Sequence, residues 1–287
     1  MFSKNKSSTS VRPRPRLFRA LGLNDPPPEI EVDGKIYKQV EIFKHDSWAA
    51  TALYEGLKGK ITCKFNRVQP IFGLPMGWLG RLLAKREALL FAEMADTPYI
   101  PNLAGKLTVN GREVPNVAAH DYIEGHPLMR EEHVSDEFFS QLSDLLAILH
   151  LRDWAYVDLH KRENIIVGND GKPYLIDFQV SFRLPGWWPG NSWPIRLVLR
   201  MLQKTDEYHR LKHFIQCRPD QFTPEEFERA RRRPWWISVH RLVAQPLRQL
   251  RRKFLVVICV RRGKGHANTE HEPEAAVRYE EKRKKAH

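Results

Sequence analysis

The chain has 287 residues, of which 42% are hydrophobic, and a formal net charge of +13 at pH 7. Such a chain can bury the core of one large domain or of one domain with two lobes. Its three cysteines form no C-x-x-C pair, so neither a disulfide framework nor a zinc site is indicated, and a reducing compartment is expected. The sequence contains no apolar run of membrane-spanning length and no apolar signal-peptide core at its start.

Four segments follow from the distribution of proline, charged and apolar residues. Residues 1–28 are rich in serine, arginine and proline and are predicted to be disordered. Residues 29–122 have the pattern of a β-rich lobe with one main helix, and residues 123–255 have that of a mostly helical lobe. Residues 256–287 are polar with mixed charge and are also predicted to be disordered.

The β-rich lobe contains a predicted strand that precedes its main helix. Residues 61–65 form a β-rich run with one lysine, Lys64, just after a predicted hairpin turn at residues 55–59. Residues 82–91 have the propensity and the period of a helix, and this helix carries Glu87. Taken alone, Lys64 can also be a strand lysine whose ammonium group reaches solvent.

A second predicted strand, at residues 114–119, ends in an acidic segment with glycine and proline at residues 120–128. Glycine and proline at this point indicate the end of the strand. The segment is compatible with a plain strand-to-loop boundary and with a flexible joint between two lobes.

The stretch that begins at Asp158 places three oxygen-bearing side chains around a predicted β-hairpin. Its strands are residues 165–167 and 174–176, and a Gly-Asn-Asp-Gly turn lies between them. Asp158 and Asn164 precede the hairpin, and Asp177 follows it.

These three side chains suit the transfer of a phosphoryl group from ATP. Mg²⁺ must bridge the phosphates, and it prefers hard oxygen ligands. Asp177 can be one ligand, Asn164 can supply a neutral oxygen to a second ion, and Asp158 can accept the proton of an acceptor hydroxyl. Each residue also has an ordinary structural interpretation: Asp177 as a turn cap, Asn164 as the start of a strand and Asp158 as a solvated loop acid.

The whole stretch resembles the catalytic and metal-binding loops of the protein-kinase-like superfamily, whose pattern is H-R-D-L-x-x-x-N followed by D-F-G. The resemblance implies a two-lobed α+β fold that uses ATP and Mg²⁺. It also implies that Asp158 is the catalytic aspartate and that Asn164 and Asp177 are metal ligands. His150 matches the Leu-His that ends the helix before the catalytic loop.

Several departures from this pattern indicate the nearest relatives. Tyr156 and Val157 replace the His-Arg pair, and the loop from the aspartate to the asparagine is one residue longer. Gln179 replaces the glycine of D-F-G, and no A-P-E follows. Loss of the arginine argues against switching by a phosphorylated activation loop. The departures resemble bacterial lipopolysaccharide-core sugar kinases, RIO-type kinases and aminoglycoside phosphotransferases.

The same resemblance implies roles for residues upstream. Residues 61–65 are similar to the V-A-I-K strand, which implies that Lys64 holds the α- and β-phosphates and pairs with Glu87. Glu93 is the second choice, on a different face of the helix. Residues 120–128 are similar to the interlobe hinge of aminoglycoside-type phosphotransferases. This similarity implies that adenine meets backbone groups of the following residues: His120, Asp121, Tyr122 and Ile123.

The glycine-rich phosphate loop of the superfamily has no counterpart in the sequence. Residues 43–51 occupy its place and contain no glycine. Backbone amides and the Ser47 hydroxyl can still meet phosphate oxygens, and a plain hairpin turn is the alternative interpretation.

Basic residues concentrate in the segment Arg229–Lys264, which has twelve arginines and lysines and no acidic residue. Trp235 and Trp236 lie near its start, and apolar residues recur in it at helical spacing. A basic amphipathic helix with tryptophans suits an anionic membrane surface. Packing of the apolar residues on the parent domain is the main alternative. Only basicity supports nucleic-acid binding, which is disfavoured.

Two classes of function remain open. The first is a kinase that phosphorylates a hydroxyl of a lipopolysaccharide-type sugar or another small molecule, with a Ser/Thr protein kinase as runner-up. The second is a kinase-like binding protein without turnover. We expect a monomer in the cytoplasm, peripheral on the inner face of the cytoplasmic membrane. An aromatic cluster after Asp177 is expected to line an acceptor groove: Trp187, Trp188 and Trp193.

Overall fold

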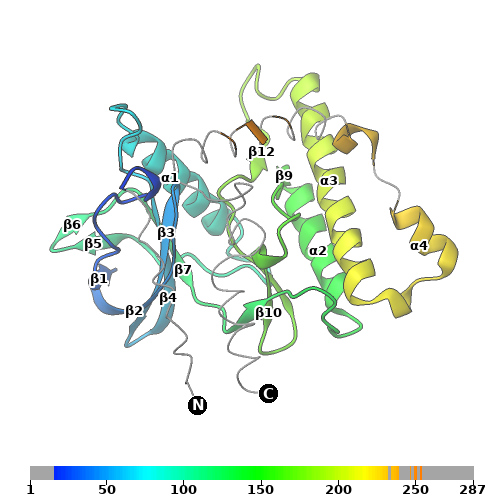
Figure 1. Cartoon of the computed structure of the whole chain (residues 1–287), viewed down its shortest axis with the longest axis horizontal. Helices are drawn as coiled ribbons and strands as arrows, with labels where there is room; N and C mark the ends of the chain where they lie inside the picture. The colour runs from blue at the N-terminus through cyan, green and yellow to red at the C-terminus, as the bar shows by residue number, and fades with distance from the viewer. Residues whose placement is uncertain (1–15, 232–233, 239–245, 247–248, 251–252, 254–287) are drawn as a thin grey trace, which may run out of the picture.

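The computed structural model describes residues 16–231, 234–238, 246, 249–250 and 253. The described chain forms two lobes (Figure 1). The strands of the first lobe, drawn in blue to blue-green, lie on the left, and the helices of the second, drawn in green to yellow, lie on the right. The predicted disordered tail at residues 256–287 lies outside the described residues.

An antiparallel sheet of seven strands, in the order β6-β5-β1-β2-β3-β4-β7, forms most of the first lobe. Its strands are β1 (Glu29–Val32), β2 (Lys35–His45), β3 (Ala49–Gly56), β4 (Gly59–Asn66), β5 (Leu107–Val109), β6 (Arg112–Glu113) and β7 (Val117–Asp121). The predicted hairpin turn at residues 55–59 is confirmed, because β3 ends at Gly56 and β4 begins at Gly59. Gly59 has a φ of 110°, which glycine adopts without steric cost.

The two faces of this sheet have different surroundings. Ala52 and Tyr54 of β3 are fully buried in the apolar core of the lobe. Thr51 alternates with them and lies opposite Lys64 of β4, so both residues belong to the other face. Helix α1 (Gly77–Glu93) contacts β4 and β7 and carries the partner of Lys64, as described below.

Two predicted elements differ from the observed ones at their ends. The helix predicted at residues 82–91 is longer and runs over Gly77–Glu93. The strand predicted at residues 114–119 is β7, which begins only at Val117. Pro115 explains this shift, because a proline has no N–H with which to join the ladder of the sheet.

Residues 16–28, which the composition predicts to be disordered, are ordered in the structure. Ala20 is fully buried, and its N–H donates to the carbonyl of Asp46 at 2.7 Å. The buried guanidinium of Arg67 donates to four backbone carbonyls: those of Leu17, Ser47, Gln69 and Pro70. A buried charge needs such partners, so Arg67 orders the segment through a tertiary contact that composition cannot indicate. Residues 1–15 lie outside the described part of the chain.

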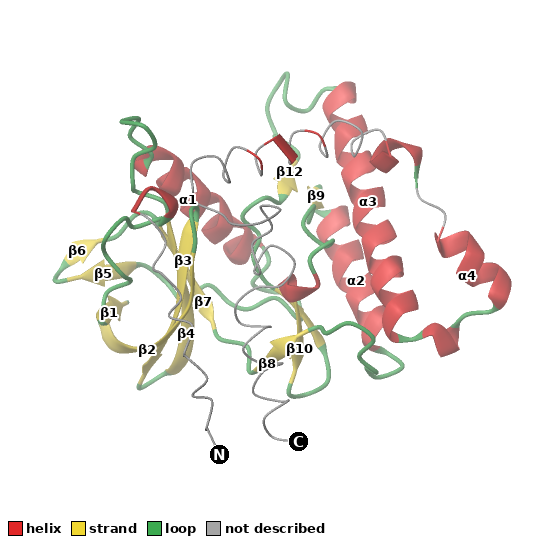
Figure 2. Cartoon of the chain, in the orientation of Figure 1, coloured by secondary structure: helices red, strands yellow, loops and turns green. Residues whose placement is uncertain are grey.

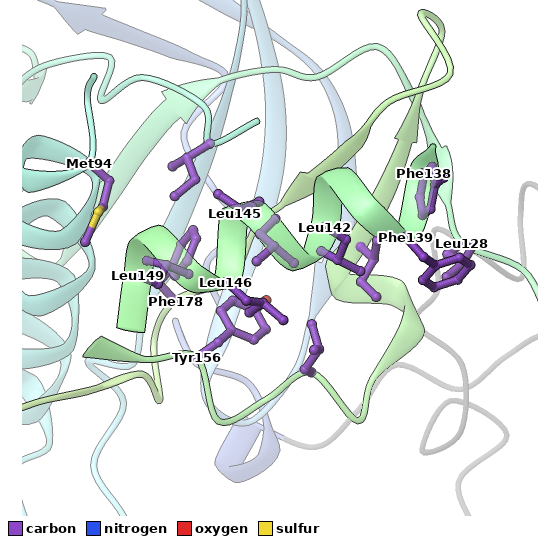
Figure 3. Close-up of a cluster of buried hydrophobic side chains, with 14 of the residues drawn as sticks. Met94, Leu128, Phe138, Phe139, Leu142, Leu145, Leu146, Leu149, Tyr156 and Phe178 are labelled. Carbon is purple, nitrogen blue, oxygen red and sulfur yellow. The ribbon is translucent and has the colours of Figure 1, made fainter. Parts of the chain in front are cut away.

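The second lobe is built on α2 (Phe138–Leu151), α3 (Trp193–Cys217) and the short α4 (Pro224–Arg231) (Figure 2). Its short strands are β8 (Gly125–Pro127), β9 (Trp154–Ala155), β10 (Ile165–Gly168), β11 (Pro173–Leu175) and β12 (Phe182–Arg183). Short 3₁₀ turns lie at Arg16–Phe18, Arg162–Asn164 and Pro219–Gln221. Leucines of α2 point toward Tyr156 and Phe178 and form the core of the lobe (Figure 3).

The predicted hairpin of the second lobe is confirmed, since β10 and β11 pair antiparallel with Ile166 opposite Tyr174. The β8 strand pairs with the other edge of β10. A β-rich first lobe with one long helix and a helical second lobe make up the two-lobed α+β fold that the sequence predicts.

Candidate active site

Three charged side chains from three elements meet where the lobes face each other. Lys64 comes from β4, Glu87 from α1 and Asp177 from the segment after β11. The Nζ atom of Lys64 lies 2.5 Å from Asp177 Oδ1 and 3.3 Å from Glu87 Oε1. Lys64 and Glu87 are buried, and 34% of the Asp177 side chain is exposed. The ammonium group therefore joins a carboxylate of each lobe.

The second choice for the lysine's partner, Glu93, has other contacts. Its Oε1 lies 2.7 Å from Arg183, and its Oε2 accepts a hydrogen bond from the indole of Trp154 at 3.2 Å. Both partners belong to the second lobe, so Glu93 joins the lobes at a different place from Glu87.

The charges in the cluster shift one another's pKa values. For Lys64, burial acts to lower the pKa, but the carboxylates of Asp177 and Glu87 outweigh it, and the pKa is raised. For Asp177, burial acts to raise the pKa, but Lys64 outweighs it and brings the pKa to about 2. Burial raises the pKa of Glu87, and Lys64 opposes this shift. Lys64 is therefore charged at neutral pH, and so is Asp177.

The loop between β9 and β10 carries Asp158 and Asn164, and both side chains are buried. Asp158 Oδ2 accepts hydrogen bonds from Lys161 Nζ at 2.7 Å and from Asn164 Nδ2 at 3.3 Å. Its Oδ1 lies 3.2 Å from His160 Nδ1. The charge of Lys161 also lowers the pKa of Asp177, so the two aspartates share the field of one lysine.

Helix α3 holds this loop through two residues that the sequence reasoning missed. The fully buried Asp206 accepts hydrogen bonds from the backbone N–H groups of Tyr156 and Val157, each at 2.8 Å. Seven positions later, His213 Nε2 lies within hydrogen-bond distance of the Leu159 carbonyl oxygen, at 2.8 Å. Residues seven apart share one face of a helix. Two polar residues at this spacing on a helix are the signal that could have indicated that α3 holds the loop around Asp158.

Two residues, one before Asp158 and one after the hairpin, have an unusual backbone conformation. The φ angle is 70° at Val157 and 59° at Asp177. A β-branched residue rarely has a positive φ, and such strain persists only where the surroundings impose it. At Val157 the N–H donates to the buried Asp206 carboxylate, and His150 Nε2 lies 3.2 Å from the Oδ2 atom of the same carboxylate.

Gln179 occupies the position at which the D-F-G pattern has glycine. Its side-chain amide donates to Asn66 Oδ1 of β4 at 2.9 Å. Nearby, Arg86 of α1 donates to the carbonyl of Ser181 at 2.8 Å. The segment after Asp177 is therefore tied to the first lobe at two points.

The turn between β2 and β3, where a phosphate loop is expected, is closed on itself. Asp46 Oδ1 accepts hydrogen bonds from the N–H groups of Trp48 at 2.7 Å and Ala49 at 3.0 Å. The hydroxyl of Ser47 donates to the Phe18 carbonyl at 3.3 Å. Ser47 thus contacts the ordered N-terminal segment, and the structure does not bring it into the cluster around Lys64.

His120, the first residue of the predicted adenine segment, lies at the back of the cluster. It is on β7 opposite Thr62 of β4, and its ring is 5.0 Å from that of Phe91 of α1, measured between centroids. Burial lowers its pKa to about 4. The ring is therefore neutral at physiological pH.

The next residues of this segment carry the chain out of the sheet. The N–H of Asp121 donates to the Asn102 carbonyl at 2.9 Å, and the N–H of Tyr122 donates to the Lys60 carbonyl at 3.0 Å. Ile123 follows at the crossing between β7 of the first lobe and β8 of the second. The segment has the position of a hinge, and its contact with adenine stays a prediction.

The basic segment Arg229–Lys264 lies largely outside the described residues. Within its described part, the indole of Trp236 donates to Thr205 of α3 at 3.2 Å. No helix among the described residues combines the length and apolar character that a membrane crossing needs. The described residues also contain no group of three or more His, Cys, Asp and Glu side chains placed to hold a metal ion by themselves.

No protein-family model and no curated protein matches this sequence. Among solved structures, the chain is similar to the Rio2 kinase from Chaetomium thermophilum, with 14% sequence identity and a TM-score of 0.46. The match covers 64% of this chain and 59% of that chain, so it spans less than two thirds of the Rio2 kinase structure. The strand order, the position of α1 on the sheet and the hairpin between Asp158 and Asp177 make up the two-lobed α+β arrangement described above.

Proposed function

We propose that this chain is a kinase that transfers the γ-phosphoryl group of ATP to a hydroxyl group and depends on Mg²⁺. The meeting of Lys64, Glu87 and Asp177, beside the loop that carries Asp158, supports this most strongly. Burying charged groups costs free energy even when they are paired. Clusters of buried, mutually perturbed charges are for this reason more frequent at functional sites than elsewhere.

Each side chain has a role in this reaction. Lys64 binds the α- and β-phosphates, and Glu87 keeps its ammonium group in position. Asp158 orients the acceptor hydroxyl and takes its proton as the new bond to phosphorus forms. Asp206 and His213 act as positioning residues, because they fix the backbone on both sides of Asp158.

The oxygen donors near the cluster suit Mg²⁺, which prefers carboxylate and amide oxygens and retains some of its water. Asp177 has a pKa of about 2 and is therefore an anionic ligand at any physiological pH. Asn164 adds a neutral oxygen. When bound, Mg²⁺ neutralises charge on the phosphates of ATP.

Lys44 is a second phosphate-binding side chain in this proposal. It lies opposite Thr51, which in turn lies opposite Lys64, so the three residues form one row on one face of the sheet. Its Nζ atom lies 2.8 Å from Asp46 Oδ2, and 44% of its side chain is exposed. Because Asp46 occupies the amides of the turn, an ammonium group is the donor that this side of the cleft offers to phosphate.

The proposed acceptor is a hydroxyl of a lipopolysaccharide-type sugar or of another small molecule. The absence of an A-P-E sequence after Asp177 supports a small acceptor over a protein serine or threonine. We also propose that the protein works in the cytoplasm, where ATP is available and where the free thiols of Cys63 and Cys217 stay reduced.

One observation favours a second candidate, a kinase-like protein that binds nucleotide without turnover. The hydrogen bonds from Trp48 and Ala49 to Asp46 withhold from the γ-phosphate the backbone amides that a glycine-rich loop provides. Such a protein would bind Mg²⁺-ATP at Lys64 and Asp177 and transfer nothing.

Calorimetric titration of the full-length protein with ATP, followed by a turnover assay with a panel of sugar acceptors, separates these candidates. We expect binding in Mg²⁺ that weakens about tenfold or more in EDTA, together with Mg²⁺-dependent release of ADP. Binding without ADP release would support the non-catalytic candidate. Absence of Mg²⁺-dependent ATP binding would refute both.

A further inference from the structure

Residues 185–200, which we call the tryptophan tip, comprise the loop after β12 and the first two turns of α3, at the upper edge of Figure 1. The exposed fractions of its large apolar side chains are 67% for Trp187, 85% for Trp188, 77% for Trp193, 50% for Leu197 and 44% for Val198. The indoles therefore lie on the outside of the molecule, and their part in an acceptor groove stays a prediction. Exposed apolar side chains gathered in one place indicate an interaction surface.

The tip is anchored at its base to the catalytic loop. Ile195 and Leu199 of α3 face inward and pack in an apolar cluster with Ala155 and Val157. Val157 immediately precedes Asp158. The exposed tryptophans thus lie on, or just before, a helix whose inner face packs on the second lobe, and the outer face is the part without a partner among the described residues.

The charge on the outer face of the tip has one sign. Residues 179–205 contain no aspartate and no glutamate. Arg196 and Arg200 of the tip, and Lys204 one turn further along α3, are exposed, and their spacing from Trp193 places them on the same side of the helix. No ion pair of these three residues occurs within the part of the chain that the structure describes.

We propose that the tryptophan tip docks on the surface of a membrane that contains anionic lipids. At the boundary between lipid headgroups and acyl chains, an indole ring is buried while its N–H group stays hydrated. Arginine and lysine beside it meet the phosphates of anionic lipids, and the two effects add. Trp193 and Leu197 share one face of α3 with Arg196 and Arg200, and the exposed Trp187 and Trp188 lie in the loop just before this helix. This inference does not depend on whether the site transfers phosphoryl groups.

A second copy of the chain suits this surface less well. A twofold interface would place the tip of one copy against the same tip of the other. Arg196 and Arg200 would then face their own counterparts, and the like charges would repel each other.

Docking at the tip would bring the membrane close to the catalytic loop. The inner face of the tip packs on Val157, the residue before Asp158, so α3 lies between the outer face of the tip and this part of the loop. Trp235 is 70% exposed and precedes Trp236, whose indole donates to Thr205 of α3, so it adds an exposed indole beside this helix. A hydroxyl in a lipid headgroup would be presented to the site from this side.

Flotation of the full-length protein with lipid vesicles tests the proposal. Vesicles of phosphatidylcholine are compared with vesicles that contain about 30 mol% phosphatidylglycerol. We expect the wild-type protein to float with the anionic vesicles. The triple variant Trp187→Ser/Trp188→Ser/Trp193→Ser should have a partition coefficient lower by about tenfold or more.

A control variant replaces exposed apolar residues of the first lobe. Leu57→Ser/Phe72→Ser removes side chains that are 104% and 78% exposed and should float like the wild type. Arg196→Gln/Arg200→Gln should weaken binding to anionic vesicles and leave the melting temperature unchanged, which separates lipid contact from a defect in folding.

Three results would overturn the proposal. Equal flotation of the triple tryptophan variant and the wild type would show that another surface binds lipid. Equal binding to neutral and anionic vesicles would remove the role of the arginines. A wild-type protein that ignores vesicles but sediments as a dimer, with the triple variant a monomer, would identify a second copy as the partner.

Discussion

The two sides of the cleft between the lobes are built in different ways. On the second-lobe side, φ is positive at Val157, just before Asp158, and at Asp177 itself. The buried Asp206 accepts hydrogen bonds from the N–H groups of Tyr156 and Val157 and so holds the backbone before Asp158. On the first-lobe side, the β2–β3 turn is short, and Asp46 takes up its amides. The second-lobe side presents side chains to a ligand, whereas on the first-lobe side the backbone N–H groups of the turn already donate to Asp46.

This difference bears on how phosphate can be bound. A glycine-rich loop binds phosphate with backbone amides that have no other partner. A turn capped by its own aspartate can do so only after that carboxylate has moved away. The proposed phosphate contacts on the first-lobe side therefore come from the side chains of Lys44 and Lys64, and the two sides of the cleft can be tested separately.

Removing Asp177 should have the largest effect on the second-lobe side. In Asp177→Ala, the carboxylate that pairs with Lys64 and is proposed to hold Mg²⁺ is lost, so Mg²⁺-ATP binding should weaken by about 100-fold or more. Calorimetric titration measures this directly. Wild-type affinity in the variant would remove Asp177 from the site, and Asp170→Ala, in the exposed hairpin turn, is the matched control.

Removing Asp158 should separate transfer from binding. In Asp158→Ala, turnover should fall by about 10²–10⁴-fold, because the group proposed to accept the hydroxyl proton is gone. The dissociation constant for Mg²⁺-ATP should change little. Steady-state kinetics and titration together measure both quantities, and a variant with normal turnover would contradict the assignment.

Removing Asp206 tests whether the loop around Asp158 depends on the hydrogen bonds that Asp206 accepts from its backbone. Asp206→Ala leaves the N–H groups of Tyr156 and Val157 buried without an acceptor, which should lower the free energy of unfolding by about 3 kcal/mol. Asp206→Asn retains one oxygen acceptor and should lose less, while turnover recovers in part. Denaturant titration and kinetics measure the two effects. Equal stability of the alanine variant and the wild type would mean that the loop does not need this anchor.

Removing Lys44 tests the first-lobe side. In Lys44→Ala, KM for ATP should rise about tenfold, because one charge-assisted contact to phosphate is lost, and kcat should change less. The affinity for adenosine, which has no phosphate, should stay the same. Lys38→Ala, on the same strand opposite Glu55, is the control. An unchanged KM for Lys44→Ala would indicate that this side of the cleft does not bind phosphate through Lys44.

A smaller effect should appear at His213, the second α3 residue that holds the loop, as a pH dependence of the free energy of unfolding. Burial lowers the pKa of His213 to about 4 in the folded state, whereas in the unfolded chain it is near 6.5. Between these values the unfolded chain binds more protons, so His213 costs stability as the pH falls below about 6.5. The stability advantage of the wild type over His213→Asn should therefore shrink by about 1–2 kcal/mol from pH 7 to pH 5. Denaturant titrations at both pH values measure it, and a constant difference would contradict burial of the neutral imidazole.

Local elements could be predicted well because their signals are local. The hairpin of β10 and β11 follows from two short apolar runs around a Gly-Asn-Asp-Gly turn, and α1 follows from helical propensity. The predicted start of β7, at residue 114, is wrong because Pro115 has no N–H to donate to the neighbouring strand. The meeting of Lys64 with Glu87 and Asp177 could be expected only through a resemblance to a known pattern, since 113 positions separate Lys64 from Asp177.

The sequence by itself determined which chemical groups this protein possesses and which short segments form strands and helices. Alternation of apolar residues and the turn residues act within a few positions, so they can be interpreted without a structure. The tertiary structure alone decided how buried polar groups are satisfied: Arg67 orders residues 16–28, Asp46 closes the β2–β3 turn, and Asp206 fixes the loop before Asp158. A buried donor or acceptor must find a partner in space, and packing sets which partner is within reach.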